Sequence, residues 1–371
     1  MNVADVVGPN ASVVQNANTT RLRLSAANTY TGATTITLGR LVLGAANTIS
    51  SVSSVDITGT LDMATFSDTI DALTGAGTVN NGTAGTPTLT VGGNNSSGTF
   101  SGVIQNTVGT LSFKKSGNGT ETLTAANTYS GTTTFNGGIL NAGSATAAGS
   151  MVFSGGTLQY SAANQQDYSS RFSTAANQAI SIDTATQAVT FATALVSSGG
   201  SLTKVGNGTL TLTAAGSVGT TFSGGGTLQV GNNAALADVT TVDNNGNNLT
   251  LGGVSSGAGG VRKIGNGTLT LNASNTFTGD TTVNAGTVSA TNDANFGAGG
   301  ANKVILNGGA GGNGKLILGN ANTFNGTTVV SNGVLQLANT NALQSSGLNY
   351  NVGTLQFDSS ITGPRWADLI A

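Results

Sequence analysis

The residues best suited to chemistry are three aspartates in one short stretch, Asp62, Asp68 and Asp71. Two carboxyl groups held close together can cleave a glycosidic bond, one as acid and the other as base or nucleophile. No basic partner recurs beside them, and aromatic residues, which form platforms for sugars, make up only 5% of the chain. We therefore predict that these aspartates serve turns, and we predict no catalytic residues and no enzymatic activity.

A lysine that recurs in one short motif, at Lys115, Lys204 and Lys263, is the second candidate. In each copy one residue separates it from a Gly-Asn-Gly triplet. A row of such lysines could bind an anionic ligand. A lysine ahead of a glycine corner is also a common solvated residue that discourages unwanted strand pairing. We predict the solvated role.

The composition excludes several classes of site. The chain has no histidine and no cysteine, which excludes disulfides, the usual zinc and haem sites, and catalytic triads that need either residue. The glycine-rich segment 308–314 lacks the aspartate of calcium-binding coils, so we predict a loop there. With 12 basic and 14 acidic residues, no surface is available to neutralise phosphates. We expect no metal, no cofactor and no nucleic-acid partner.

The elements that must position these residues follow from a repeat. Only 7% of the 371 residues are charged, and 57 are glycine. The block Lys-x-Gly-Asn-Gly-Thr-x-Thr-Leu begins at Lys115, Lys204 and Lys263. A second block contains Asn-Thr-Tyr/Phe and is found at 28–36, 127–135, 275–283 and 322–329. Repeats of this kind predict stacked structural units.

A finer spacing lies within the repeat. The triplet Gly-x-Leu/Val recurs in steps of 18–20 residues, for example at Gly39, Gly59 and Gly77. Between these glycines, apolar residues such as Leu210 and Leu212 alternate with threonine, which is typical of β-strands. One such rung cannot bury its own apolar face, whereas stacked rungs form a continuous core. We predict an all-β solenoid with about 18–20 residues per rung, or about 19 to 20 rungs in all.

Aromatic residues recur at one position of the second block, at Tyr30, Tyr129, Phe277 and Phe324. Internal stacking is the simpler interpretation, and a sugar-binding stripe on the surface is the alternative. The Thr-x-Thr arrays could likewise form a flat ice- or carbohydrate-binding face. Threonine is also the ordinary outward residue of a strand, and we favour that interpretation.

The composite motif resembles the autotransporter-associated β-strand repeat, also called the passenger-associated transport repeat. Residues 263–288 carry the motif in full, and residues 21–45, 114–143, 204–231 and 314–338 carry it in part. The resemblance implies a right-handed parallel β-helix in a large secreted or surface-displayed bacterial protein. In that family the repeat is structural and linked to passenger secretion, and it implies no catalytic residue.

The predicted organisation is one solenoid over residues 21–358, with an irregular, glycine-free stretch near 160–200. Residues 1–20 are predicted to form an N-terminal cap or attachment segment, and residues 359–371 a C-terminal cap or docking tail, because open solenoid ends must be protected. The chain shows no signal peptide and no apolar run of 18 residues, so we expect no transmembrane helix.

Three functional hypotheses remain open from the sequence. The first is a non-enzymatic structural solenoid of the bacterial cell surface or extracellular space, acting as a stalk, adhesin or fibre subunit. Its partners would be further copies of itself, surface glycans or other cells. The second is a virion structural protein such as a tail spike or head fibre. The third is a polysaccharide-active β-helix enzyme.

Overall fold

The computed structural model places the chain in two compact units. The N-terminal unit comprises Met1–Gln166, Arg171–Ser173 and Gln178–Asp183, and the C-terminal unit comprises Asp167–Ser170, Thr174–Asn177 and Thr184–Ala371. The structure describes residues 2–3, 8, 10–143, 149–214, 219–222, 227–230, 234–235, 240–243, 249–251, 255–257, 259–272, 274–290, 296, 302–308, 313–321, 324–343, 346–359 and 361.

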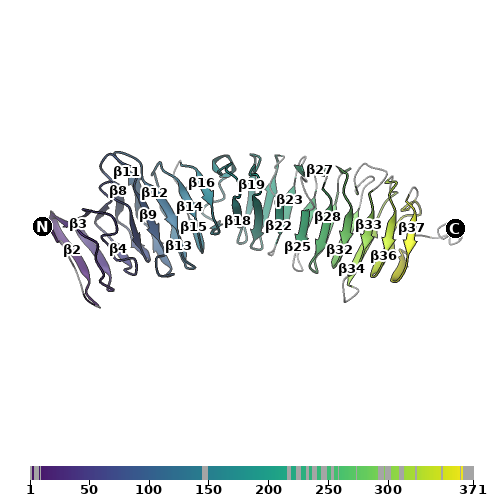
Figure 1. Ribbon diagram of the computed structural model, residues 1–371, viewed down its shortest axis with the longest axis horizontal. Coiled ribbons are helices and arrows are strands. Elements are labelled where there is room, and N and C mark those ends of the chain that lie inside the picture. The colour runs from purple at the N-terminus through teal and green to yellow at the C-terminus, as the bar shows by residue number, and fades with distance from the viewer. Residues whose placement is uncertain are drawn as a thin grey trace. The chain divides into compact units, whose positions relative to one another are not determined.

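The N-terminal unit is built from two parallel sheets (Figure 1). Within this unit the larger sheet has the order β11-β8-β5-β3-β4-β7-β10-β13-β15-β17-β18, and β2 pairs with both β1 and β3. Its strands are β1 (Asn2–Val3), β2 (Val13–Leu24), β3 (Thr34–Leu43), β4 (Val55–Ile57), β5 (Thr60–Asp62), β7 (Leu73–Gly75), β8 (Thr78–Asn81), β10 (Gly98–Phe100), β11 (Val103–Asn106), β13 (Thr120–Leu123), β15 (Ile139–Ala142), β17 (Thr157–Gln159) and β18 (Ala179–Asp183). The smaller sheet has the order β16-β14-β12-β9-β6. Its strands are β6 (Asp68–Ile70), β9 (Thr88–Val91), β12 (Ser112–Lys115), β14 (Thr133–Phe135) and β16 (Met151–Phe153).

The C-terminal unit repeats this plan. Its longest sheet has the order β19-β21-β23-β26-β29-β32-β34-β36-β38. These strands are β19 (Ala188–Phe191), β21 (Thr209–Leu212), β23 (Thr227–Val230), β26 (Leu249–Leu251), β29 (Thr268–Leu271), β32 (Gly286–Ala290), β34 (Gly314–Leu318), β36 (Val334–Leu337) and β38 (Thr354–Phe357). A second sheet runs β25-β28-β31-β33-β35-β37, a third runs β24-β27-β30, and β20 pairs with β22. Their bounds are β20 (Ser201–Val205), β22 (Gly219–Phe222), β24 (Ala234–Ala235), β25 (Thr240–Asp243), β27 (Ser255–Gly257), β28 (Val261–Ile264), β30 (Thr276–Phe277), β31 (Thr281–Val283), β33 (Val304–Leu306), β35 (Thr328–Val330) and β37 (Leu348–Tyr350).

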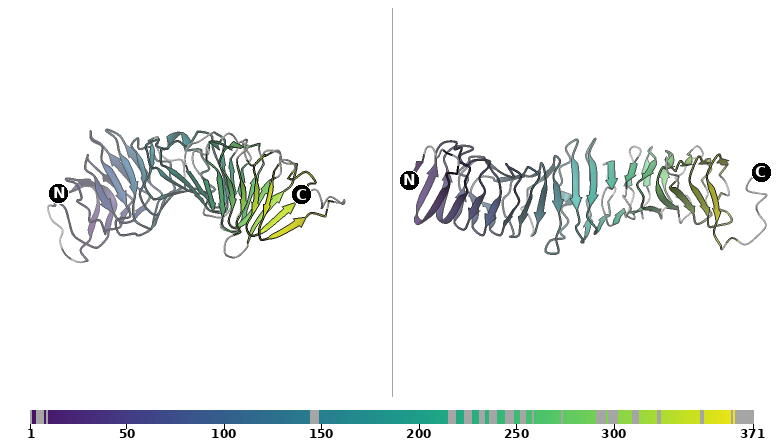
Figure 2. Two further views of the ribbon diagram at one scale, coloured as in Figure 1. Left: turned by 45° about the vertical axis from the view of Figure 1, so that its right-hand side comes forward. Right: turned by 90° about the horizontal axis from the view of Figure 1, so that it is seen from below.

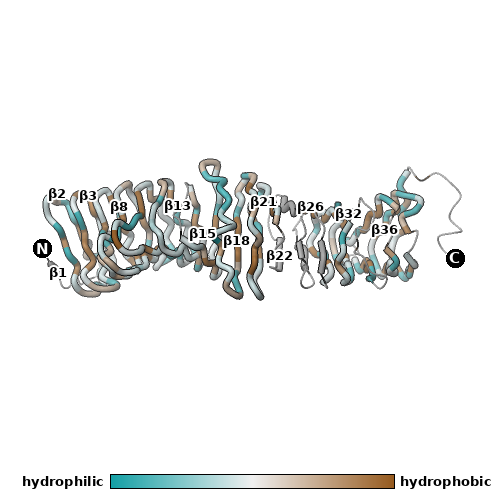
Figure 3. Tube along the Cα trace, turned by 90° about the horizontal axis from the view of Figure 1, so that it is seen from above, coloured by the Kyte–Doolittle hydropathy of each residue, from teal (hydrophilic) through white to brown (hydrophobic). Residues whose placement is uncertain are grey.

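Every ladder between these described strands is parallel, and equivalent repeat residues stack in register. Leu210 pairs with Leu228 in the next rung, and Leu269 with Val288. Apolar and polar residues alternate along single strands (Figure 3), and the inward set is buried: Leu210 and Leu269 are both 0% exposed. Each fully buried aliphatic side chain contributes about 1.5–3 kcal/mol to folding. The prediction of an all-β parallel solenoid is confirmed.

The rungs are not uniform in length, as the uneven loops in Figure 2 illustrate. Thr268 pairs with Thr287, 19 residues further on, but Thr78 pairs with Val103 after 25 residues and Gly286 with Gly314 after 28. The longer rungs hold extra residues in their loops. The chain consequently makes about 14 turns, so our division of the length by a constant rung, which predicted 19 to 20, was wrong.

The regions predicted to be irregular or capping have mixed outcomes. Strand β2 begins at Val13, inside the predicted N-terminal cap. The 160–200 stretch contains the one helix among the described residues, the 3-10 helix η1 (Ser169–Arg171), followed by β18 and β19. Of the predicted C-terminal cap, only Ser359 and Ile361 belong to the described residues, and the remainder lies outside them.

Candidate functional site

The recurring lysine lies inside the solenoid in all three copies. Lys115 is 1% exposed, and Lys204 and Lys263 are 0% exposed. The prediction of a solvated lysine was therefore wrong. The reason is the strand alternation: each lysine lies two residues after a buried residue of its own strand, Phe113, Leu202 or Val261.

The buried ammonium groups bind backbone carbonyls of the glycine corner that follows. Lys204 Nζ lies 3.2 Å from the Val205 oxygen and 2.7 Å from the Gly206 oxygen. Lys263 Nζ lies 2.6 Å from the Ile264 oxygen and 2.5 Å from the Gly265 oxygen. A buried carbonyl without a donor is costly, so the lysine supplies donors that the strand ladders cannot.

The same arrangement occurs at Lys115, whose Nζ donates to the Ser116 oxygen and, at 3.3 Å, to the Gly117 oxygen. Gly117 has φ +63°, in the left-handed region, and a Cβ there would lie 2.2 Å from the Gly92 oxygen. Both the torsion and the close approach require glycine at this corner. Gly206 and Gly265 share the left-handed torsion, with φ of 78° and 73°. The motif is thus a structural unit in which a left-handed glycine turns carbonyls toward a buried lysine.

A buried glutamate distinguishes the first of these copies. Glu121 is 0% exposed and occupies the position that Leu210 and Leu269 hold in the other two copies. Its Oε2 accepts a hydrogen bond from the Leu73 N–H at 3.4 Å, and its Oε1 has no hydrogen-bond partner. We call residues 115–124 the Glu121 copy and residues 263–272 the Leu269 copy.

Burial governs the ionisation of this pair. It raises the pKa of Glu121 to about 8, against the smaller opposing effects of the Leu73 N–H and the Lys115 charge. Burial lowers the pKa of Lys115, while the Glu121 and Asp71 charges act in the opposite direction. Below its raised pKa the Glu121 carboxyl is mostly protonated. Our sequence reasoning missed this residue, although a charged residue where other copies have leucine was the available signal.

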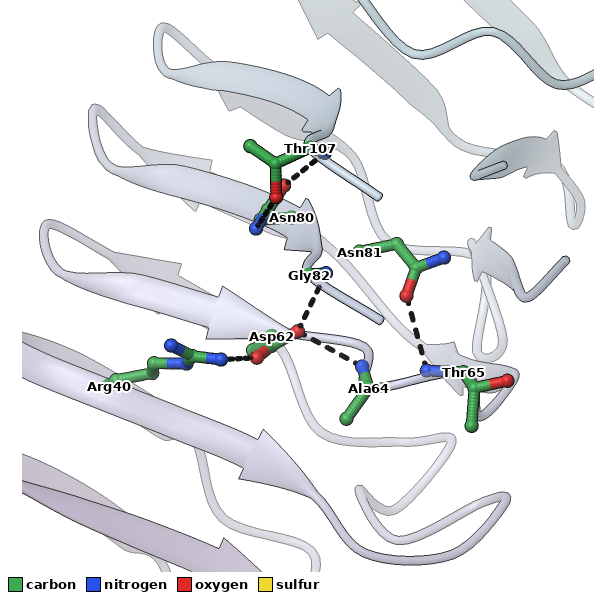
Figure 4. A network of polar contacts seen from close by, with 8 residues as sticks. All are labelled: Arg40, Asp62, Ala64, Thr65, Asn80, Asn81, Gly82 and Thr107. Carbon is green, nitrogen blue, oxygen red and sulfur yellow. Dashed lines mark hydrogen bonds and ion pairs between the residues drawn. The ribbon is translucent and has the colours of Figure 1, made fainter. Parts of the chain in front are cut away.

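The three aspartates lie apart in their interactions, because each accepts hydrogen bonds from a different loop. Asp62 Oδ1 accepts from the Ala64 N–H at 3.0 Å and the Gly82 N–H at 3.3 Å, and Asp62 also forms an ion pair with Arg40 (Figure 4). Asp71 Oδ1 accepts from the Asn94 and Ser96 N–H groups at 2.9 and 3.0 Å. These carboxylates join consecutive rungs.

Asp68 is 1% exposed and also serves the backbone. Its Oδ2 accepts from the Thr48 and Ile49 N–H groups at 2.8 and 3.1 Å. Burial raises the pKa of Asp68 to about 6, although these hydrogen bonds act in the opposite direction. A raised carboxyl pKa is common in catalytic acids, but here the same oxygen is occupied by two backbone donors from one loop.

The recurring aromatic residues point into the core. Tyr30, Tyr129 and Phe277 are 0% exposed and Phe324 is 3% exposed. The alternative of a sugar-binding stripe was therefore wrong, and the interpretation of internal aromatic residues is confirmed by their burial. Tyr129, for example, packs against Phe113 with ring centroids 6.3 Å apart.

A threonine four residues further along interacts with each tyrosine. The Tyr30 hydroxyl lies 2.6 Å from Thr34 Oγ1, and the Tyr129 hydroxyl 2.7 Å from Thr133 Oγ1. Where phenylalanine replaces tyrosine, the outcomes differ. Thr328 Oγ1 pairs with Ser346 Oγ at 2.9 Å, whereas Thr281 Oγ1 is buried with no partner. The hydroxyl of the aromatic residue therefore decides whether a buried threonine is satisfied.

The outward face of the longest C-terminal sheet carries registered hydroxyl groups. Thr190 pairs with Thr211, and Thr270 with Ser289. The ice- or carbohydrate-binding alternative for this face stays a prediction. Residues 309–312 of the glycine-rich segment lie outside the described residues.

Two searches of the described residues bear on cofactors and membranes. They contain no group of three or more Asp and Glu residues arranged to hold a metal ion. Among the described helical residues, none forms a segment long and apolar enough to cross a membrane. The buried charged groups reported above consequently act on the protein's own backbone.

Comparison with known proteins agrees with the repeat. The passenger-associated-transport-repeat family model matches residues 17–43, 113–142, 202–230, 261–290 and 311–337. These five segments include all three lysine copies, so the resemblance inferred from the motif is confirmed. One relative is the adhesin BmaC autotransporter of Brucella suis biovar 1 (strain 1330), which is 36% identical over 174 residues. That alignment covers 42% of this chain and 5% of the relative, and no solved structure matches.

Proposed function

We propose that this chain, which carries five passenger-associated transport repeats, is a non-enzymatic segment of a bacterial surface adhesin. Its part in that role is mechanical: a stacked β-solenoid extends outward and holds loops and strand faces at a distance from the cell. The similarity to an autotransporter adhesin of Brucella suis supports this proposal. Because the chain spans a small part of that relative, its location and partners are also part of the proposal.

The observation that carries the proposal is where the reactive side chains lie. Lys115, Lys204, Lys263 and Glu121 are all at most 1% exposed, and each lysine donates hydrogen bonds to its own corner. A binding or catalytic cleft would place such groups against solvent and a ligand. Their use inside the stack supports a scaffold in which chemistry is spent on shape.

The test uses the native bacterium and a strain that lacks the gene. Intact cells are treated with proteinase K, and the chain is followed with an antibody against residues 149–175. Adherence of both strains to host cells is then counted. We expect the protein to be cleaved on intact cells and adherence to fall in the deletion strain. A protein that is protected until the cells are lysed would contradict surface display.

A second readout examines the enzymatic alternative. The purified chain is incubated with a panel of polysaccharides, and new reducing ends are measured. We expect none above the background of an Asp68→Ala variant. Release of reducing ends by the wild-type chain, abolished by Asp68→Ala with the fold intact, would replace the structural role with a catalytic one.

A further inference from the structure

We infer that the outward face of β2 and β3 binds a sulfated polysaccharide through three arginines, Arg21, Arg23 and Arg40. This inference rests on the proposed adhesive role and names the class of ligand. It begins from the sequence: between Val6 and Val55 these three arginines are the only charged residues. In a chain with 12 basic residues and a net charge of −2, this is a concentrated positive region.

The register brings the three arginines together. Arg21 pairs directly with Arg40 in the neighbouring strand, and Arg23 lies two residues further along β2, on the same face as Arg21. Strand geometry places such neighbours about 5 Å apart across strands and about 7 Å apart along one strand. Arg21 and Arg40 are exposed, and Arg23 is half-buried, with its Nη2 donating to the Gly44 oxygen at 3.3 Å.

Like charges directly opposite each other in a sheet destabilise it. Asp62 compensates part of this charge, because it forms an ion pair with Arg40 (Figure 4). Its other oxygen is occupied by the backbone of the Ala64 and Gly82 loops. The positive face thus keeps a net charge that an anionic ligand would neutralise, and the planar guanidinium group pairs with sulfate through two parallel hydrogen bonds.

The rest of the column indicates which anion carrier fits. Beyond Arg40, the same outward column continues through Thr60 to Thr78, which are half-buried residues with hydroxyl groups. A linear sulfated polysaccharide offers closely spaced anions followed by hydroxyl groups, which match arginine and then threonine. An anionic membrane would instead require apolar side chains that insert next to the basic residues, and this column has none between Arg21 and Thr78.

The test measures binding of the full soluble chain to dextran sulfate, with neutral dextran and phosphatidylglycerol vesicles as parallel probes. The variant is Arg21→Gln/Arg23→Gln, which leaves the Arg40–Asp62 ion pair intact. The matched control is Lys303→Gln, an exposed cation of the C-terminal unit. Thermal unfolding by circular dichroism shows whether each variant keeps its fold.

We expect binding to dextran sulfate only, and the double variant to bind at least about tenfold more weakly. Each ionic contact released by salt adds about one unit to the slope of log K against log salt, so the slope is expected to fall from about −3 to about −1. The control variant is expected to match the wild-type chain.

Three results would overturn the inference: no binding to dextran sulfate, equal loss in Lys303→Gln, or binding to the vesicles in place of dextran sulfate. These outcomes are separable from the surface role. A chain that is displayed and adhesive on cells but does not bind dextran sulfate refutes the arginine ligand alone.

Discussion

The Glu121 copy and the Leu269 copy share the same corner but differ in what surrounds it. In both, a buried lysine donates to the two carbonyls that follow it. In the first, the position six residues after the lysine is the buried Glu121, and in the second it is Leu269. The lysine therefore does not depend on a buried counter-charge, since its role is the same where leucine replaces the acid.

The aromatic block that follows each copy differs in the opposite direction. Tyr129 satisfies Thr133 with its hydroxyl, whereas Phe277 leaves Thr281 Oγ1 without a partner. Each region thus carries one unsatisfied buried oxygen, Glu121 Oε1 in the first and Thr281 Oγ1 in the second. The comparison teaches that the stack requires the lysine corner in both regions and tolerates a local polar defect elsewhere.

The largest expected effect follows from removing a lysine where no acid accompanies it. Lys263→Met leaves the Ile264 and Gly265 carbonyls without their charged donor, and we expect a loss of about 3 kcal/mol in the local free energy of unfolding. Hydrogen exchange of the segment 259–290, followed by mass spectrometry, measures this loss. Lys303→Met is the control and is expected to change exchange by less than about 0.5 kcal/mol. Equal protection in Lys263→Met and the wild-type chain would show that the lysine is dispensable.

A smaller effect, confined to the N-terminal unit, is expected from pH. The pKa of Glu121 is about 8 in the folded chain against an ordinary 4.5, so the folded state holds the proton more tightly than the unfolded state. The resulting stability is complete below pH 4.5 and is lost as the pH rises to 8. Between pH 6 and 8.5 we expect a loss of about 2 kcal/mol, measured by urea denaturation of the full chain.

Glu121→Gln separates this effect from its neighbours. Asp68, with a pKa raised to about 6, acts with the same sign but at lower pH, and burial lowers the pKa of Lys115. The difference between the wild-type and Glu121→Gln profiles therefore reports on Glu121 alone. Parallel profiles over pH 6 to 8.5 would mean that Glu121 is ionised in the folded chain.

The smallest expected effect exchanges the aromatic residues of the two regions. Phe277→Tyr would give Thr281 Oγ1 the partner that Tyr129 gives Thr133, and we expect a gain of about 1 kcal/mol. Tyr129→Phe is the reciprocal change, with an expected loss of about 1 kcal/mol. Thermal unfolding of both variants measures the pair. Destabilisation by Phe277→Tyr would mean that the Phe277 pocket has no space for the hydroxyl.

Much of the fold could be predicted from the sequence because its physical signals are local. The alternation around Leu210 and Leu212 indicates strands, and recurring glycines indicate corners. Rung length could not be predicted at the same level, since the long loop before Gly314 has no signal within the strands. The lysines were misplaced because charge was weighed above strand parity, although Phe113 and Lys115 share one face.

The most direct measurement of the central claim, that the repeat lysines are buried structural donors, is amine acetylation of the native chain with site-resolved mass spectrometry. Lys114 and Lys115 are neighbours on opposite faces of β12, with Lys114 half-buried and Lys115 buried. We predict that Lys114, Lys303 and Lys315 are modified in the folded chain. We also predict that Lys115, Lys204 and Lys263 react only in concentrated guanidinium chloride. Modification of Lys115 at the rate of Lys114 in the folded chain would contradict the buried corner.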